Sequence, residues 1–500
     1  MSQIRTRFAP SPTGYLHIGS LRTALFNYLW AKKNNGQFLL RIEDTDQARL
    51  VEGAQENLIK ILQLFGLNFD NHEPMVQSTR TKIYQEFAQK LVAESKAYYC
   101  FCSSERLDDL RKTQTEKKLV PKYDGHCRNL SQEEVSAKLQ AGEKAVIRFK
   151  MPENQTVEMH DEVYGDIKVK TEDLDDFVLL KSDNFPTYHL ANIIDDHEME
   201  ISHVIRADEW LPSLPKHILL YEAFGWPQPT FVHLPLLLNP DRSKLSKRQG
   251  DVAVEDFVKK GYLKEAILNY VALLGWNPKD EREFFTLEEL VANFSLEHIN
   301  KTGAIFDIQK LNWFNSQYIR KVFYATADEV IYGKKIEPHT IEPGNLMIKL
   351  KNKNILELAQ SFIPNDISLD LKNKIIKIFS SRLNNLAELA EVASFVWELP
   401  AYDKAMLIFK KSDLEKTKTG LNLTLELLNQ TEEIAWQEEN LKQLLSDLVA
   451  QNNLTAGDVF WPIRVSLSGR EQSPSPTEIL EVLGKEESLK RIQVAVDKLK

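Results

Sequence analysis

The first hundred residues alternate between the apolar patterns of strands and of helices. A short apolar run over 3–9 predicts a strand, and apolar side chains spaced three and four apart from Leu21 predict a helix that Gly36 ends. The apolar run within 37–46 predicts a second buried strand, and the amphipathic pattern that closes at Gly66 predicts a second helix. This order of elements predicts a parallel sheet with right-handed crossovers.

The pattern becomes less regular beyond residue 100. The stretches 144–152 and 166–180 predict strands of an insertion. Alternation of strands and helices resumes over 185–240, with a helix over 214–224. From about residue 320 the apolar residues lie at helical spacing among many lysines and glutamates. The sequence therefore predicts an α/β fold that is followed by an all-α region.

Composition limits the class of protein. A chain of 500 residues is long enough for roughly three to four domains. Its apolar runs are far shorter than the roughly 20 residues that span a bilayer, and the N-terminus "MSQIRTRFAP" lacks the apolar core of a signal peptide. The 3 cysteines cannot form a disulfide framework. We therefore expect a cytoplasmic protein that does not contact membranes.

The net charge of −9 argues against a surface coated with nucleic acid. It leaves room for a local basic track, because electrostatic steering depends on where the charges lie and not on their sum.

The loop "RFAPSPTGYLHIGS", residues 7–20, joins the first predicted strand to the first predicted helix. Ligands of parallel α/β sheets bind outside the carboxyl ends of the strands, where helix N-termini attract anions. Gly14 and Gly19 allow a ligand to approach the backbone, and His17 adds a donor. The loop predicts a nucleotide-phosphate site without the spacing of a P-loop. The alternative is a tight structural turn with an exposed histidine.

A second polar loop, "NPDRSKLSKRQGD", covers residues 239–251 and carries Lys244, Lys247 and Arg248. Lysine-rich loops are often only solvated surface. This loop, however, follows the buried run "FVHLPLLL", so it also lies at the exit of a predicted strand. Two cationic loops at one sheet edge can hold a triphosphate from both sides, with lysine acting as a mobile point charge.

"HIGS" at 17–20 and "KLSKR" at 244–248 resemble the two nucleotide-binding motifs of class I aminoacyl-tRNA synthetases, whose usual forms are His-Ile-Gly-His and Lys-Met-Ser-Lys-Ser. Four further segments are similar to bacterial glutamyl-tRNA synthetases: "RFAPSPTGYLHIGSLRTALFNYLWAKKNNGQFLLRIEDTD", "FPTYHLAN", "HVIRADEW" and "VFWPIRVSLSGREQSP". "IRADEW" favours the glutamyl over the related glutaminyl enzymes.

The resemblance implies a Rossmann-type parallel-sheet catalytic domain with an inserted α+β acceptor-binding domain, followed by all-α anticodon-binding domains. We expect the following boundaries: the catalytic domain in two halves over 1–100 and 190–240, the acceptor-binding insertion over 101–189, a stem-contact domain with the "KLSKR" loop over 241–322, and the helical anticodon-binding region over 323–500.

The resemblance also implies a reaction, which is ATP-dependent activation of glutamate to glutamyl-adenylate and its transfer to the 3′ end of tRNA-Glu, with Mg²⁺ accompanying ATP. Such a protein must supply mainly positioning and charge stabilisation. The catalytic residues that the resemblance implies are His17, Lys244 and Lys247, and further contacts to ATP come from Gly19, Glu209 and Leu237. Ser20 replaces the second histidine of the first motif, which places more of the role on His17.

Glutamate carries two carboxylates and one ammonium group, so its pocket needs cations and an anion. Six residues match the family's glutamate pocket: Arg7, Ser11, Glu43, Tyr188, Asn192 and Arg206. Arginine suits a carboxylate through its planar fork. A buried arginine left unpaired by glutamine could give about 10⁴-fold rejection of that amino acid. The alternative for Glu43 is a surface ion pair with Arg41.

The cysteines Cys100, Cys102 and Cys127 have the spacing of a zinc site that some members of the family carry. Those members add a histidine two residues after the third cysteine. Here that position is Asn129, and His126 lies on the other side of Cys127. Structural zinc almost always takes four protein ligands, so we expect a metal-free remnant, with zinc as the alternative.

The C-terminal region is expected to contact tRNA. The basic stretches 371–382 and 410–420 could contact phosphates, although a solvated helix face is the alternative for any single lysine. The family implies a monomer. Other functions left open are charging of tRNA-Gln as well, a catalytically inactive RNA-binding paralogue, a truncated paralogue that glutamylates a tRNA base, and another nucleotidyltransferase such as a pantothenate synthetase.

Overall fold

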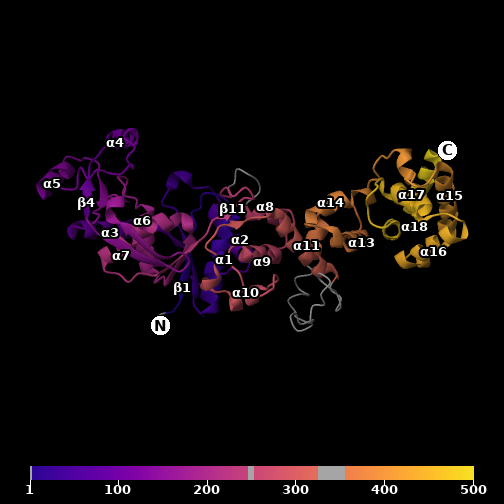
Figure 1. Ribbon diagram of the computed structural model, residues 1–500, viewed down its shortest axis with the longest axis horizontal. Coiled ribbons are helices and arrows are strands. Elements are labelled where there is room, and N and C mark those ends of the chain that lie inside the picture. Colours follow the sequence, from indigo (N-terminus) through magenta and orange to yellow (C-terminus); the bar gives the residue numbers. More distant parts are fainter. Residues whose placement is uncertain (1–2, 246–252, 325–354) are drawn as a thin grey trace. The chain divides into compact units, whose positions relative to one another are not determined.

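A computed structural model describes residues 3–245, 253–324 and 355–500. The chain forms two compact units (Figure 1). The first contains Met1–Phe257 and Ile267–Ile308, and the second contains Val258–Ala266 and Gln309–Lys500.

The first unit begins with the predicted alternation of strands and helices. Its elements are β1 (Arg5–Phe8), α1 (Ile18–Lys33), β2 (Gln37–Ile42), α2 (Ala54–Leu64), β3 (Met75–Val76) and α3 (Thr81–Ala93). β1 pairs with β2 and β2 pairs with β3, both in parallel, which confirms the predicted pairing. The helix α1 starts three residues before Leu21, because His17 caps it.

A four-stranded sheet in the order β7-β6-β10-β9 continues the fold. It contains β6 (Thr156–Asp161), β7 (Gly165–Lys170), β9 (His203–Ala207) and β10 (Thr230–Leu234). β10 is parallel to both β9 and β6. The carbonyl of Arg5 accepts a hydrogen bond from Ser202 at 3.0 Å, which joins the start of β1 to the segment entering β9. The helices α6 (Tyr188–Glu198) and α7 (Leu214–Phe224) pack their apolar faces into the same core as α3.

The inserted segment forms an antiparallel sheet of β4 (Ala97–Cys100), β5 (Val146–Phe149) and β8 (Val178–Leu180). Two polar helices, α4 (Ser104–Glu116) and α5 (Gln132–Gln140), accompany it. The prediction of strand structure throughout 166–180 is only partly right, because β7 and β8 lie in different sheets. The turn between them is fixed by Thr171, whose backbone and hydroxyl bond to Gln155, and it carries a run of acidic residues that does not favour a strand.

Short elements complete the described residues up to Tyr324. They are β11 (Leu237–Leu238), α8 (Val254–Lys259), α9 (Lys264–Leu273), α10 (Leu287–Asn293), β12 (Ala304–Ile305) and α11 (Ile308–Tyr324). β11 and β12 pair in parallel, which places residues 236–239 beside 304–306.

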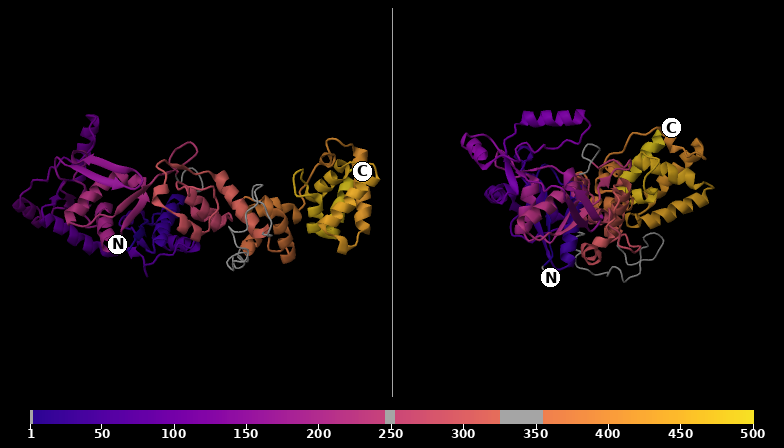
Figure 2. Two further views of the ribbon diagram at one scale, coloured as in Figure 1. Left: turned by 60° about the horizontal axis from the view of Figure 1, so that its bottom comes forward. Right: turned by 60° about the vertical axis from the view of Figure 1, so that its left-hand side comes forward.

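The C-terminal part of the second unit is helical throughout its described residues, as predicted (Figure 2). Its helices are α13 (Leu369–Phe379), α14 (Leu389–Val392), α15 (Leu414–Gln430), α16 (Glu438–Gln451), α17 (Ala456–Ser468) and α18 (Pro476–Lys498). α15 and α17 approach closely at Gly420, where an added Cβ would lie 2.2 Å from the carbonyl oxygen of Asp458. No helix among the described residues has the length and apolar character needed to cross a bilayer.

Candidate functional site

The loop before α1 ends in a side-chain cap. His17 is the N-cap residue, and its Nδ1 accepts a hydrogen bond from the backbone N–H of Gly19 at 3.0 Å. An imidazole that accepts at Nδ1 carries its hydrogen on Nε2 in the neutral form, so the donor predicted at His17 is Nε2. The N–H of Gly19 is used in this cap, so it is not one of the unpaired N–H groups that the start of α1 offers to an anion.

The structure brings the first loop next to the residues that follow the second loop. His17 forms a β-bridge with Ala253, and the carbonyl of Leu16 accepts a hydrogen bond from Val254 at 2.9 Å. Leu237 lies against the first motif, because its Cδ1 is 3.9 Å from the point that a Cβ atom would occupy if one were added to Gly19. Residues on both sides of the second motif therefore lie against the first motif, although the two motifs are about 225 residues apart in the sequence.

Lys244 and Glu209 also meet at this region. Their side chains form an ion pair, and Lys244 makes a β-bridge with Leu238. Lys247 and Arg248 lie outside the described residues. The structure thus brings together five of the six residues predicted for ATP binding and leaves Lys247 undescribed.

Arg22 is a residue of this region that sequence reasoning missed. It is fully buried on α1, and its guanidinium donates to the carbonyl oxygens of Leu274 (3.1 Å) and Pro235. Burial lowers the pKa of Arg22 to about 10. Because Pro235 leads into β11 and the second motif, Arg22 ties the helix of the first motif to the segment that presents the second. The signal was an arginine among the apolar residues of a helix.

A chain of alternating charges lies at the carboxyl ends of β1 and β2. Arg7 donates to Asp196 from Nε at 2.9 Å and from Nη2 at 3.3 Å. Arg41 donates to the same carboxylate at 2.6 Å and to Glu43 at 2.9 Å. The amide of Asn192 donates to Oε1 of Glu43 at 3.2 Å. Three of the six predicted pocket residues are therefore connected through two residues that were not predicted for the pocket.

The charged residues that form this network are almost completely buried. Arg41 has no exposed side-chain area, so the alternative of a surface ion pair between Arg41 and Glu43 is wrong. Burial by itself raises the pKa of Asp196, but the guanidinium groups of Arg7 and Arg41 outweigh burial and hold this pKa below its usual value. Asp196 was missed in the sequence, where two adjacent aspartates on the apolar face of α6 were its signal.

Arg206 has a different environment. It stands next to the last residue of β9, and it donates to the hydroxyl of Tyr188 at 2.8 Å and to Nε2 of His233 at 3.0 Å. Its Nη1 also lies 3.3 Å from Nδ1 of His217. Its Nη2 is buried and has no hydrogen-bond partner among the described residues. Burial raises the pKa of Tyr188, so this hydroxyl stays protonated at neutral pH.

Ser11 is the least connected of the six predicted pocket residues. It is exposed in the loop before α1, and its carbonyl accepts a hydrogen bond from Thr13. The neighbouring carbonyl of Pro10 accepts from the backbone of Glu43 at 2.9 Å, which places Ser11 near this residue. Within the described residues its side chain makes no hydrogen bond to the other five.

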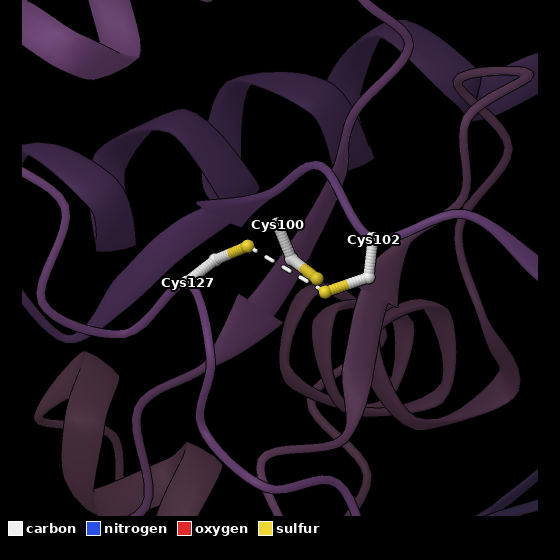
Figure 3. A group of neighbouring side chains, drawn as sticks. All are labelled: Cys100, Cys102 and Cys127. Carbon is white, nitrogen blue, oxygen red and sulfur yellow. Dashed lines mark hydrogen bonds between the residues drawn. The ribbon is translucent and has the colours of Figure 1, made fainter. Parts of the chain in front are cut away.

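The three cysteines come together, as their spacing predicted (Figure 3). Their sulfur atoms all lie within 4.8 Å of one another, and Sγ of Cys102 is 3.6 Å from that of Cys127. The hydroxyl of Tyr123 lies 3.3 Å from Sγ of Cys100 and 3.6 Å from Sγ of Cys102. Burial raises the pKa of Cys102 to about 11, so without a cation this thiol is protonated.

The donor set of the cysteine cluster fits zinc. Three sulfurs at these separations are compatible with the roughly 2.3 Å Zn–S distances of a tetrahedral site. Asn129 and His126 are both exposed and do not belong to the cluster. The hydroxyl of Tyr123, which the sequence did not single out, stands where it could complete the set.

The two basic stretches of the C-terminal region differ in how their charges are used. On α13 and α15, Lys374, Lys416 and Lys418 form ion pairs with acids of the same helix region, which agrees with a solvated face for these three. Lys410 and Lys411 are exposed and have no ion pair among the described residues. They remain the candidates for phosphate contacts.

A cavity of about 180 Å³ lies between α17 and Phe409, the residue that precedes Lys410 in the sequence. It is lined by Phe409, Trp461, Gly457, Phe460, Ala456 and Arg464. The rings of Phe409 and Trp461 have their centroids 5.3 Å apart, and Nε of Arg464 is buried without a hydrogen-bond partner among the described residues. Aromatic rings next to an arginine are a surface on which a nucleic-acid base can stack.

Comparison with known proteins gives one consistent result. The sequence pattern of "tRNA synthetases class I (E and Q), catalytic domain" matches residues 3–313, and that of "Anticodon binding domain" matches residues 354–496. The chain is 44% identical to the glutamate–tRNA ligase of Alkaliphilus metalliredigens over 100% of both chains, and 43% identical to that of Clostridium kluyveri over 100% of this chain and 99% of the other.

A solved structure gives the same result. The crystal structure of a glutamate tRNA ligase from Elizabethkingia meningosepticum, in complex with its amino acid, superposes with a TM-score of 0.84 at 34% identity and covers 100% of both chains.

The buried histidines of this region predict that the first unit loses stability in mild acid. Burial lowers the pKa of His189 from 6.5 to about 4 and that of His217 well below 6.5. Between these values the unfolded chain binds protons that the folded chain does not. The free energy of unfolding should therefore fall as pH falls from about 6.5 to 5, by up to about 1.4 kcal/mol per pH unit for each such histidine.

Denaturant unfolding at pH 7.5, 6.5, 5.75 and 5.0 measures this slope. His203→Asn should flatten it, because burial also lowers the pKa of His203 to about 4. His160→Asn is the control, since His160 is exposed and Asp166 raises its pKa. A free energy of unfolding that stays constant or rises between pH 6.5 and 5 would contradict the prediction.

Proposed function

Since the chain belongs to the class I tRNA synthetases (E and Q), we propose that it is a glutamate–tRNA ligase, which attaches L-glutamate to the 3′ end of tRNA-Glu with ATP. The observation in the site that best supports glutamate is Arg206. A buried guanidinium with one nitrogen left without a partner is costly unless an anion pairs with it. A carboxylate of the substrate supplies that anion.

The first step is attack of the α-carboxylate of glutamate on the α-phosphorus of ATP. A bond forms between a carboxylate oxygen and phosphorus, and the bond to the bridging oxygen breaks, so pyrophosphate leaves with its electron pair. In the proposal, Nε2 of His17 and the ammonium groups of Lys244 and Lys247 stabilise the charge on the phosphate oxygens. Mg²⁺ accompanies ATP and neutralises part of its charge.

The second step transfers the glutamyl group to tRNA. A ribose hydroxyl at the 3′ end attacks the carbonyl carbon of the adenylate, an ester bond forms, and AMP leaves.

Binding of ATP is proposed to break the ion pair between Lys244 and Glu209. A phosphate that binds Lys244 competes with the carboxylate of Glu209, which then becomes available to accept hydrogen bonds from the nucleoside.

Recognition of glutamate is proposed to use both ends of the molecule. Arg206 faces one carboxylate through its Nη2, and Arg7, which is already paired with Asp196, lies nearby and supports the binding of glutamate less directly. Oε1 of Glu43 accepts from Arg41 and Asn192, whereas its Oε2 makes no hydrogen bond among the described residues and can accept from the ammonium group. Ser11 and Tyr188 add hydroxyl groups.

For tRNA we propose that the cavity lined by Phe409, Trp461 and Arg464 receives an anticodon base, with Lys410 and Lys411 at the flanking phosphates. The support is the stacking surface, the unpartnered guanidinium nitrogen and the match of the anticodon-binding pattern to this part of the chain.

The alternatives are weakened by coverage of the whole chain. A truncated paralogue or a pantothenate synthetase would lack the region that matches the anticodon-binding pattern. Charging of tRNA-Gln in addition to tRNA-Glu stays open as an alternative. The cytoplasmic location, the monomeric state and the four domain boundaries given above stay predictions from the sequence.

Attachment of labelled glutamate to separate tRNA-Glu and tRNA-Gln transcripts tests the proposed function. With ATP and Mg²⁺ present we expect charging of tRNA-Glu, because relatives that match over the full chain bear the name glutamate–tRNA ligase. Charging of both transcripts would identify an enzyme with relaxed anticodon recognition. No charging of either, while a control synthetase charges the same transcripts, would contradict the proposal.

Replacement of Lys247 tests the role of the second motif. Lys247→Ala should lower kcat by about 10²–10³, since removal of one preorganised donor to a developing charge costs about that much. The KM for glutamate should change little. Lys60→Ala, an exposed lysine of α2, is the matched control. Turnover of the Lys247 variant like that of the unmodified enzyme would remove this residue from the mechanism.

We also propose that Cys100, Cys102 and Cys127 bind zinc with the oxygen of Tyr123, in place of the metal-free remnant expected from the sequence. Elemental analysis of the purified protein should then find about one zinc per chain, and Tyr123→Phe should lose zinc to a chelator faster. Zinc below about 0.1 per chain after expression in zinc-supplemented medium would support the metal-free remnant.

A further inference from the structure

The side chains that form direct hydrogen bonds with Arg206 are all uncharged. They are the hydroxyl of Tyr188, Nε2 of His233 and Nδ1 of His217. Arg7 and Arg41 differ, because each of them makes direct ion pairs with carboxylates. Arg206 therefore keeps a guanidinium charge that no adjacent carboxylate cancels within the described residues.

The hydrogen bonds fix the tautomer of both histidines. A guanidinium only donates, so Nδ1 of His217 and Nε2 of His233 must be acceptors. The hydrogen of His217 then lies on Nε2, which is 3.1 Å from Nδ1 of His189. The hydrogen of His233 lies on Nδ1, which is 2.7 Å from Oδ2 of Asp161.

Both histidines are held rigidly. His217 and His233 have no exposed side-chain area. His233 is opposite Arg206 in the register of β9 and β10, and Asp161 also accepts backbone hydrogen bonds from Val163, Tyr164 and His233. Burial lowers the pKa of both histidines, so they are neutral at pH 7. A protonated imidazole could not accept from Arg206 and would repel it.

We propose that His217 and His233 are positioning residues that determine specificity: as neutral acceptors they orient Arg206 while leaving its charge and its Nη2 for a carboxylate of the amino-acid substrate. This inference rests on the proposed function. It explains why the polar partners are imidazoles, since a carboxylate at either place would neutralise Arg206 and reduce the preference for glutamate over glutamine.

Two variants of His217 separate positioning from packing. His217→Leu fills a similar volume without an acceptor. His217→Asn places an amide oxygen near the position of Nδ1 and keeps the acceptor. The control is His203→Leu, which changes a different histidine, one that is partly buried in β9 and bonds to Ser202 and not to Arg206.

Steady-state charging kinetics with tRNA-Glu are the main readout. His217→Leu should raise the KM for glutamate about 10- to 100-fold, as expected when a charged buried donor loses its acceptor. The KM for ATP should stay within about threefold, since the ATP contacts do not involve His217. The ratio of kcat/KM for glutamate over glutamine should fall about tenfold or more.

The conservative variant and the control must behave differently from His217→Leu. His217→Asn and His203→Leu should both stay within about threefold of the unmodified enzyme in the KM for glutamate. The rise in melting temperature on addition of glutamate gives a second readout that needs no turnover, and it should disappear in His217→Leu alone. If His217→Leu does not fold, His233→Met and His233→Gln provide the same comparison at the other acceptor.

Three results would overturn the inference. The first is a KM for glutamate in His217→Leu within threefold of the unmodified enzyme. The second is an equal rise in the KM for glutamate and for ATP, and the third is failure of His217→Asn to restore the KM for glutamate. If the unmodified enzyme itself does not charge tRNA with glutamate, the proposed function fails instead, so the two failures are distinguishable.

Discussion

Burial of three guanidinium groups at the carboxyl ends of three parallel strands, β1, β2 and β9, is the constraint on which the site depends. Arg7, Arg41 and Arg206 each stand next to the last residue of a parallel strand, in β1, β2 and β9. Charges cannot be buried there without partners. Two of the arginines are compensated by Asp196, Glu43 and their neighbours, and the third is surrounded by neutral acceptors. This division gives the site a rigid frame and one cation that is available to a ligand.

Contacts of α1 and of the loop before it explain how the residues around the two nucleotide motifs are positioned. His17 caps α1 through Nδ1, which leaves the donor function to Nε2. Arg22, one turn further along α1, holds the carbonyls of Pro235 and Leu274. The helix that carries the first motif therefore also anchors the segment that leads to the second. Backbone contacts of Leu16 with Val254 and of His17 with Ala253 join the loop of the first motif to the residues that follow the second.

Much of this architecture could be predicted from the sequence. The apolar periodicity predicted the parallel pairing of β1 and β2 and the bounds of α7, and the motif resemblance predicted pocket residues of which most meet in space. Asp196, His217, His233 and Arg22 could not be predicted in their roles. Each is a polar residue on an apolar face, and periodicity does not show which distant charge it meets. The segment 166–180 was misjudged because its apolar pattern does not show that its two ends join different sheets.

In this proposal the charge of Arg206 is kept for a carboxylate of the substrate. A crystal structure of the protein with bound glutamate would show whether it is used in this way. We expect a carboxylate oxygen of glutamate within hydrogen-bond distance of Nη2 of Arg206, with the bonds from Arg206 to Tyr188, His217 and His233 retained. Glutamate bound without contact to Arg206, or an Arg206 that has turned to pair with a protein carboxylate, would show that this charge has another role.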